Sequence, residues 1–435
     1  MDLQHPSNRT ELTLYIDSRI PPIRTTSSSS FIKHAITHPM HKLESKSDIV
    51  RAFNPAWYST TMGTGIVGIL IHNFPYQWSP LRYIGMAIAL FNILLYVVIS
   101  VLFITRLVKY RDFYDILMSP QLSMSLGSIP MGLSTLINSL VIMLARYDLH
   151  WLPTFVLVLW CIDVVLSISS SLLVPFAVFS HQKHTLETMS STLLMPVVPN
   201  VVGATTGAIV ASAHTGSAAT VIILTSYVLW GMGMGIAMML VTAYLIRLTM
   251  FKLPPKESMA SMLIPLGPLG QSSYGIQQLG VQALRVFPSE FPQIEYLGNM
   301  LYGIGFFFGL LLWALASWWL TLGIYSAIYT RVRGPVPFNL GWWALIFPVS
   351  TFVSSSNSLW GITNFTFFRA LAAPLIVSLF LLWLFVLLRT IWYAWSGELF
   401  KPDNIDRLVT LENKGNSLTP STRTPVNSKD SSDIV

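Results

Sequence analysis

Long stretches of the sequence contain no Asp, Glu, Lys or Arg. The gaps between charged residues cover 52–81, 83–105, 116–145, 188–246, 258–284, 296–330 and 334–368. Each gap is longer than the roughly 20 apolar residues that cross a bilayer as a helix, and the 188–246 gap is long enough to cross twice. The pattern therefore predicts an all-α membrane protein with many transmembrane helices.

Apolar segments bounded by polar or charged turns divide the middle of the chain into ten predicted transmembrane helices. They cover 55–72, 82–105, 120–145, 151–179, 192–212, 218–246, 258–285, 299–329, 339–363 and 370–396. Consecutive segments pair into five helical hairpins, and we expect the hairpins to surround a central pore. The transport domain is therefore predicted over 51–396, with disordered cytosolic tails over 1–50 and 397–435, which are polar and rich in Ser and Thr.

The composition excludes one class of protein, and the distribution of cations predicts how the chain is oriented in the membrane. Hydrophobic residues make up 53% of the chain and charged residues 10%, against about 25% charged in a soluble domain, which excludes a soluble globular protein. With the N-terminus in the cytosol, nine cations fall on cytosolic turns and four on outer turns. The nine are Arg106, Lys109, Arg111, Lys183, Arg247, Lys252, Lys256, Arg331 and Arg333, and the four are Arg82, Arg146, Arg285 and Arg369. The positive-inside rule therefore predicts a multi-pass protein with both termini in the cytosol.

Prolines and amides are concentrated in the odd-numbered segments. Prolines predicted inside these helices are Pro130, Pro196, Pro199, Pro265, Pro268 and Pro348, whereas the second, sixth and eighth segments have none. A proline frees a backbone carbonyl, which lipid does not tolerate unless another helix or a water-filled cavity receives it. We therefore expect the odd helices to line an interior and the even helices to face outward. The predicted pore-lining residues are Gly63, Thr64, Gly65, Pro130, Asn138, Pro199, Asn200, Pro268, Gln271 and Gln277.

The interior of the odd segments carries no charged side chain. A pathway between them would bind ions through hydroxyls, amides and the positive ends of helix dipoles, which favours weakly held anions. No nucleophile–base pair and no metal-ligand cluster is visible, so we expect no catalytic residue, no metal, no cofactor and no nucleic-acid partner. A receptor would need a sizeable outer loop, and the longest predicted outer turn covers only about 286–298.

Two intramembrane features have competing interpretations. Asp163 lies in the middle of the fourth segment and is either a proton-linked transport residue or a structural hydrogen-bond partner of a neighbouring helix. Gly63, Gly65 and Gly68 spell GxGxxG, but no strand precedes them, so we expect close helix packing rather than a dinucleotide site. The same interpretation applies to the GxxxG pairs Gly203/Gly207, Gly231/Gly235 and Gly305/Gly309.

Five strings of the sequence resemble a known family. They are FNPAWYSTTMGTG from Phe53, NFPY from Asn73, HTLETM with LMPVVPNVVGA between His184 and Ala204, PLGPLGQSSYGIQQLG from Pro265, and NLGWWALIFPVSTF from Asn339. Together they are similar to the fungal sulfite efflux pump family, within the tellurite-resistance/dicarboxylate transporters and related to plant slow anion channels. The resemblance covers about 51–395. Ser272 and Ser273 depart from it, since we expect glycines there, and this bears on pore width.

The resemblance implies specific properties. It implies five hairpins around a pore in each protomer, a homotrimer, and a phenylalanine on the ninth helix that occludes the pore, which would be Phe347, next to Pro348. An aromatic plug beside a kink blocks hydrated ions by steric closure and dewetting. The expected function is export of sulfite or bisulfite across the plasma membrane. The alternative is a malate carrier of the same fold, although a dicarboxylate would ordinarily meet an Arg or Lys in its pathway, and the odd segments offer only Arg285.

Overall fold

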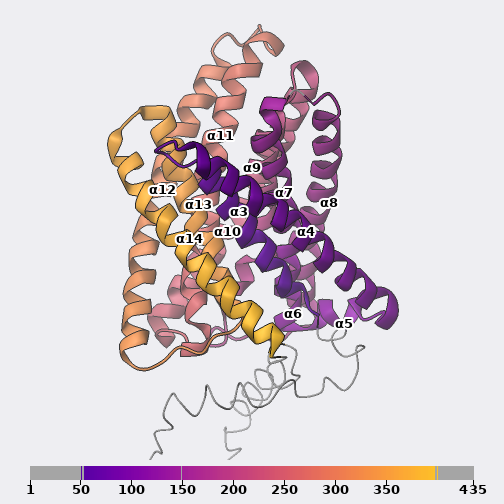
Figure 1. Cartoon of the computed structure of the whole chain (residues 1–435), viewed down its shortest axis with the longest axis vertical. Coiled ribbons are helices and arrows are strands. Elements are labelled where there is room, and N and C mark those ends of the chain that lie inside the picture. The colour runs from indigo at the N-terminus through magenta and orange to yellow at the C-terminus, as the bar shows by residue number, and fades with distance from the viewer. Residues whose placement is uncertain (1–49, 51–52, 148, 397–398, 400–435) are drawn as a thin grey trace, which may run out of the picture. The chain divides into compact units, whose positions relative to one another are not determined.

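Each of the ten predicted segments is helical in the computed structural model (Figure 1). The structure describes residues 50, 53–147, 149–396 and 399, all within one compact unit, 43–435, and no strand occurs in that described part. The unit 1–42, and the predicted tails apart from Val50 and Leu399, lie outside the described residues. The elements are η1 (Pro55–Trp57), α3 (Tyr58–His72), α4 (Ser79–Tyr110), α5 (Phe113–Met118), α6 (Pro120–Met124), η2 (Ser125–Gly127), α7 (Ser128–Leu144), η3 (Ala145–Tyr147), α8 (Leu152–Ser180), η4 (Ser191–Leu194), α9 (Val198–Ala211), α10 (Gly216–Phe251), η5 (Lys256–Leu263), α11 (Leu266–Glu290), α12 (Leu297–Val332), η6 (Leu340–Trp342), α13 (Trp343–Thr363) and α14 (Thr366–Trp395).

Six helical stretches of the described part are long and apolar enough to cross a membrane. They are Ser79–Tyr110, Pro120–Leu144, Leu152–Ser180, Gly216–Phe251, Leu297–Val332 and Thr366–Trp395. These six include every even-numbered segment of the sequence. The helices of the first, fifth, seventh and ninth segments are shorter or more polar. The protein is therefore a multi-pass helical membrane protein.

The helices divide into an inner and an outer group. The inner helices are α3, α7, α9, α11 and α13, and the outer helices are α4, α8, α10, α12 and α14. All 15 residues of α3 and all 14 of α9 are buried, whereas only seven of the 32 residues of α4 are. In Figure 1, α8 and α12 lie at opposite edges of the view, with α3, α9 and α13 between them. The predicted division between odd helices inside and even helices outside is therefore confirmed.

The prolines of the inner helices do not lie where the sequence analysis placed them. Pro199 and Pro268 lie in the first turn of α9 and α11, whereas Pro348 lies inside α13 and Pro130 inside the continuous helical stretch Pro120–Leu144. Pro196 and Pro265 precede the helices altogether. The first-turn N–H groups have no intrahelical partner, so proline costs nothing there and its fixed φ favours helix initiation. The predicted interior position is thus wrong for Pro196, Pro199, Pro265 and Pro268.

Each inner helix follows a short 3₁₀ helix. The 3₁₀ helices are η1 before α3, η2 before α7, η4 before α9, η5 before α11 and η6 before α13. η1 contacts η2, and η5 contacts both η4 and η6, so these elements gather at one end of the bundle. The inner α-helices therefore all begin at this end of the bundle.

Glycines set the closest helix approaches. A Cβ on Gly65 would collide with Thr135 of α7 and lie 2.6 Å from Asn92 Nδ2 of α4. A Cβ on Gly68 would lie 3.2 Å from the Gly85 carbonyl oxygen. The interpretation of GxGxxG as a packing motif is therefore confirmed, as it is for Gly203/Gly207 and Gly305/Gly309, whose Cβ positions are also occupied by neighbouring helices.

The interpretation is wrong for Gly231 and Gly235 of α10. A Cβ at either position would meet nothing within 4 Å, because both face away from the rest of the described chain. The packed glycine lies between them. A Cβ on Gly233 would lie 2.6 Å from Val201 Cγ2 of α9.

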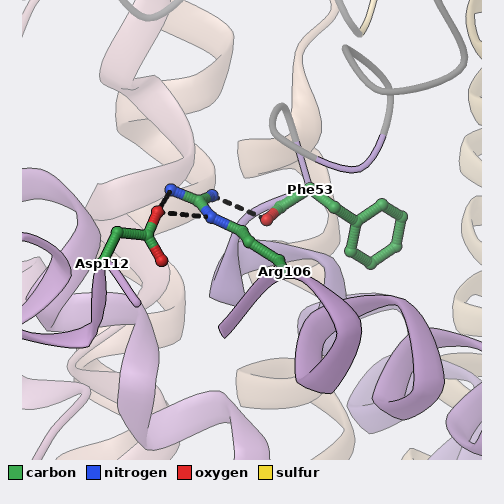
Figure 2. A network of polar contacts seen from close by, with 3 residues as sticks. All are labelled: Phe53, Arg106 and Asp112. Atoms are coloured by element: carbon green, nitrogen blue, oxygen red, sulfur yellow. Dashed lines mark hydrogen bonds and ion pairs between the residues drawn. The ribbon is translucent and has the colours of Figure 1, made fainter. Parts of the chain in front are cut away.

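A buried ion pair fixes the start of the first inner helix (Figure 2). Arg106, near the C-terminal end of α4, donates from Nε and Nη2 to Asp112 Oδ2 at 2.9 and 2.7 Å. Its Nη1 donates to the carbonyl oxygen of Phe53 at 2.7 Å, just before η1. Because Arg106 is only 8% exposed, these bonds compete little with water. The guanidinium therefore ties the backbone ahead of α3 to the end of α4.

We expect Arg106→Gln to lower the free energy of unfolding by about 1–3 kcal/mol, since it leaves the Asp112 carboxylate and the Phe53 carbonyl without their donor. The measurement is thermal unfolding of the purified, detergent-solubilised protein. Lys109→Gln is the matched control on the same helix, because Lys109 is exposed and a surface change of this kind shifts stability by no more than about 0.5 kcal/mol. Equal melting temperatures for the two variants would contradict a stabilising role for the Arg106 bonds to Asp112 and Phe53.

Gly65→Ala and Gly235→Ala give a second test. The new methyl group at position 65 collides with α7 and should destabilise by about 1–3 kcal/mol through overpacking. At position 235 the methyl group enters open space and should leave stability unchanged or slightly raised. Thermal unfolding in detergent distinguishes the two, and a stable Gly65→Ala variant would refute the packing assignment.

Candidate functional site

A pocket lies where all five inner helices meet. It is lined by Met62, Met131, Met195, Val198, Ile264, Gly267, Pro268, Ala344, Phe347 and Pro348. Each inner helix, or the turn just before it, supplies at least one of these residues. The lining contains no charged side chain, so the pocket is the natural candidate for a constriction on a pathway between the inner helices.

The N-terminal ends of the inner helices converge on this pocket. Val198 is the first residue of α9, Gly267 and Pro268 are in the first turn of α11, and Phe347 is the fifth residue of α13. The aligned peptide dipoles of a helix place a partial positive charge at its N-terminal end. Several such ends around one space make it electropositive without any cationic side chain, and a dry lining strengthens that field.

Phe347 and Pro348 shape the pocket on the side of α13. Phe347 is 3% exposed, so its ring is enclosed by the surrounding helices. Pro348 has no N–H, which leaves the carbonyl of Ala344 without its helical partner, and Ala344 also lines the pocket. Thr351 Oγ1 donates to Pro348 O at 2.7 Å and approaches Gly267 O at 3.3 Å, which ties this part of α13 to α11.

The structure brings three of the predicted site residues together in this pocket: Pro268, Phe347 and Pro348. Pro130 and Pro199 are the chain neighbours of the lining residues Met131 and Val198. The phenylalanine found through the family resemblance therefore lies at the meeting point of the five inner helices.

Other predicted pore-lining residues contact neighbouring helices instead. Thr64 Oγ1 accepts a hydrogen bond from Trp383 Nε1 of the outer helix α14 at 3.1 Å. A Cβ on Gly63 would lie 3.2 Å from the Trp343 ring of α13, and Gly65 faces α4 and α7. A helix that is buried on every side presents its small residues to several neighbours, so position on an inner helix does not determine what a side chain faces.

The four predicted amides divide into two pairs. Asn200 Nδ2 donates to Ser171 Oγ of α8 at 2.9 Å, and Gln277 Nε2 donates to Ser355 Oγ of α13 at 3.0 Å. Asn138 and Gln271, 6% and 4% exposed, have no hydrogen-bond partner among the described residues. The Asn138 and Gln271 amides, together with Asn200 Oδ1 and Gln277 Oε1, are therefore left to hydrate or bind an ion inside the bundle.

Ser273, where the family resemblance predicts glycine, makes contacts within the bundle. Its hydroxyl donates to Gly309 O of α12 and lies 2.6 Å from Ser355 Oγ of α13. The Gln277 amide reaches the same hydroxyl at 3.1 Å. The departure at Ser273 thus adds a hydrogen-bonded link among α11, α12 and α13. Ser272 is buried as well, and its Oγ has no partner in the described part.

Asp163 is fully buried between α7, α8 and α9. Its Oδ2 accepts a hydrogen bond from Ser134 Oγ of α7 at 2.7 Å, and its Oδ1 has no partner among the described residues. One turn earlier on α8, Trp160 Nε1 donates to Gly203 O of α9 at 2.9 Å. The predicted structural hydrogen bond to a neighbouring helix is therefore present, while proton linkage stays a prediction.

The methionines of the pocket are residues that the sequence analysis missed. Met62, Met131 and Met195 come from three different segments and meet beside Phe347. Thioether side chains are flexible and polarisable, so they fill irregular space and adapt to an aromatic ring that moves. In the sequence they are three of 18 methionines in an apolar chain, and no spacing distinguishes them.

The pocket has the features expected of a passage for a small anion. No group of three or more His, Cys, Asp or Glu residues in the described ranges could hold a metal ion. The pocket offers a positive field from helix ends, an apolar lining and an aromatic closure. Such a site attracts an anion without binding it tightly, which rapid permeation requires.

Comparison with known proteins identifies relatives over nearly the whole described chain. Residues 52–391 match the profile of the voltage-dependent anion channel family. The chain is 34% identical over 376 residues to Sulfite efflux pump SSU1 of Arthroderma benhamiae and, likewise, to that of Trichophyton rubrum, covering 85% of this chain and 98% of each relative. It is 24% identical over 313 residues to the Malic acid transport protein of Schizosaccharomyces pombe, covering 71% of this chain and 70% of that relative.

Ser134→Ala and Ser167→Ala test the role of the Asp163 contact. Ser134 donates to Asp163, so its loss leaves a buried carboxyl oxygen unpaired and should cost about 1–3 kcal/mol of unfolding free energy. Ser167 lies one turn beyond Asp163 and its hydroxyl has no partner in the described part, so its removal should be nearly neutral. Thermal unfolding in detergent separates the two, and equal effects would rule out a structural role for the Ser134 bond.

Proposed function

We propose that this chain, which belongs to the voltage-dependent anion channel family, exports sulfite or bisulfite across the plasma membrane along a pathway between its inner helices. The observation that carries the proposal is the pocket at which five inner helices converge. Two relatives that share 34% of its residues over 98% of their length are named as sulfite efflux pumps. The proposed activity is transport without catalysis or cofactor.

The proposed pathway follows the axis between the helices of five hairpins, with all ten helices spanning the bilayer. Burial of the odd helices and exposure of apolar side chains on the even helices support this plan. In the proposed orientation the basic end, with Arg106, Lys252 and Arg333, faces the cytosol, together with both termini. We also propose the homotrimer that the family resemblance implies.

Phe347 is the proposed gate. Its enclosed ring, among apolar side chains, prevents a hydrated anion from passing, because the anion would have to shed water into a dry space. Pro348 weakens the helix next to it, and the methionines allow the ring to change position. Movement of one side chain, rather than a domain rotation, is then enough to open the pathway.

Sulfite is favoured over malate by the distribution of cations. The pocket lining has no Arg or Lys to pair with two carboxylates. Arg285, the one cation of the predicted odd segments, donates to the carbonyl oxygens of Ala211 and His214 at 2.6 and 3.1 Å, so it links α11 to the end of α9. The relative named for malic acid is also the more distant one, at 24% identity.

The proposed driving force is the membrane potential. An inside-negative potential drives each negative charge outward by about 2.3 kcal/mol per 100 mV, so export needs no coupled ion. Asp163 is hydrogen-bonded between helices and absent from the pocket lining, which supports the uncoupled mechanism.

We expect Phe347→Ala to raise sulfite flux in proteoliposomes under a set inside-negative potential. If the ring adds as little as about 1.4 kcal/mol to the barrier, its removal speeds passage by about tenfold. Phe352→Ala is the matched control, because Phe352 is a buried phenylalanine on the same helix that stacks on Trp313, with ring centroids 5.4 Å apart, outside the pocket. An equal rise in both variants would indicate general loosening rather than a gate.

The same assay decides between the substrates. Sulfite flux that follows the potential supports the proposal, and malate flux without sulfite flux would transfer the chain to the malate alternative. Flux that requires a pH gradient and is lost in Asp163→Asn would overturn the uncoupled mechanism.

A further inference from the structure

A second pocket lies at the C-terminal ends of two outer helices, α10 and α12. Three cations line it: Lys252 after α10, Lys256 at the start of η5, and Arg333 after α12. No Asp or Glu is among the described residues of its lining. The pocket therefore concentrates positive charge in a recess of the surface.

These cations are not neutralised by carboxylates. Across the described ranges the one ion pair is that between Arg106 and Asp112, which lies at the C-terminal end of α4. The guanidinium of Arg333 lies over the Tyr329 ring, 4.1 Å from Cζ to the ring centroid, a position that orients it but leaves its N–H groups available. Three cations with no carboxylate partner favour an anionic ligand.

Only one of the three cations in the pocket lining caps a helix end. Lys256 Nζ donates to the carbonyl oxygen of Arg333 at 2.7 Å, so this lysine satisfies the end of α12 and holds η5 against it. Neither the Lys252 ammonium nor the Arg333 guanidinium has a hydrogen bond to a described residue, and both side chains are exposed. Two cations thus remain for a ligand.

The backbone that presents Lys252 is held in place. Lys252 has a positive φ of 66°, and its carbonyl oxygen accepts a hydrogen bond from Nη1 of the buried Arg247 at 2.7 Å. Pro254 and Pro255 follow it in the lining. A proline pair restricts the turn before ligand binds, which reduces the entropy lost on binding.

The surroundings favour a lipid over a free ion as the ligand of this pocket. Next to the pocket, the outer helices expose large apolar side chains: Met250 is 60% exposed on α10, and Ile328 and Val332 are 57% and 82% exposed on α12. A molecule with an anionic head and apolar chains matches a basic recess beside such a face. We propose that this pocket binds the phosphate-bearing headgroup of an anionic membrane lipid.

The site also has a connection to the proposed gate, and this step rests on the proposed function. η5 begins at Lys256 and leads to Ile264 in the lining of the Phe347 pocket. Within it, Trp319 Nε1 donates to Met262 O at 2.8 Å and Ser191 Oγ donates to Ser261 O at 2.6 Å. A bound headgroup would fix the start of a segment whose other end borders the gate, so sulfite flux should depend on the lipid.

The test is a lipid titration of the purified full-length protein in detergent, read by native mass spectrometry. The probes are a short-chain phosphatidylinositol monophosphate, the matching phosphatidylcholine, and inorganic phosphate. The variant Lys252→Gln/Arg333→Gln removes two cations, each of which contributes about 1 kcal/mol to the free energy of binding an anionic lipid. Its affinity for the phosphoinositide should therefore fall by about thirtyfold. Lys252→Gln alone, at an exposed side chain, should reduce the affinity for the phosphoinositide by about fivefold. This single variant replaces the double variant if the latter does not fold.

Lys109→Gln/Arg331→Gln is the matched control, with the same charge change at exposed sites on the ends of α4 and α12 outside the pocket. Selective weakening in the pocket variants supports the proposal. Equal weakening in both pairs, or phosphatidylcholine binding as tightly as the phosphoinositide, would overturn it. Inorganic phosphate that binds as tightly as the phosphoinositide would also overturn it, in favour of a soluble anion.

The lipid site and the proposed transport function can be refuted independently of each other. Selective binding without sulfite flux would refute the proposed function and leave the lipid site intact. Sulfite flux that is the same in phosphatidylcholine vesicles with and without the phosphoinositide would refute the link through η5.

Discussion

The structure depends on one constraint: hydrocarbon offers no hydrogen-bond partner to a polar group. Serines, threonines and amides of the membrane region are therefore less costly inside the protein than against lipid, and this preference sorts the helices. The outer helices are long and apolar, while hydroxyls and amides collect on the shorter inner helices. Contacts such as Trp383 with Thr64, and Ser273 with Gly309, hold the inner and outer helices together.

This sorting explains what could be predicted from the sequence. Prolines and amides are costly in lipid, so their distribution revealed which segments lie inside, and the helix positions followed from charge-free stretches. Side-chain direction on the inner helices did not follow, because α3 and α9 are buried all round and have no solvent face to set a periodicity. Thr64 and Gly65 therefore carried the right chemistry on the right helix but contact neighbouring helices.

Local geometry limited the prediction in two other ways. Pro199 and Pro268 were interpreted as interior prolines, although a proline near the start of a helix favours initiation, and the sequence does not show that a 3₁₀ turn ends just before it. Phe347 became visible only through family resemblance, since nothing in an apolar segment distinguishes a plug from a packing residue. Convergence of five chain segments on Phe347 is a tertiary property that one-dimensional patterns do not contain.

Two sources of positive charge lie along the proposed pathway: cationic side chains at its entrance and helix N-terminal ends farther in. Cations such as Lys109, Lys252 and Arg333 lie at the end of the bundle where the inner helices begin, so they raise the local concentration of anions near the entrance of the proposed pathway. Farther in, the N-terminal ends of the inner helices provide a fixed positive field beside a dry, uncharged lining. A lysine in the lining would hold the anion and slow its release, whereas backbone dipoles attract it and let it leave. The proposed pathway thus keeps side-chain charges near its entrance and apart from its apolar pocket.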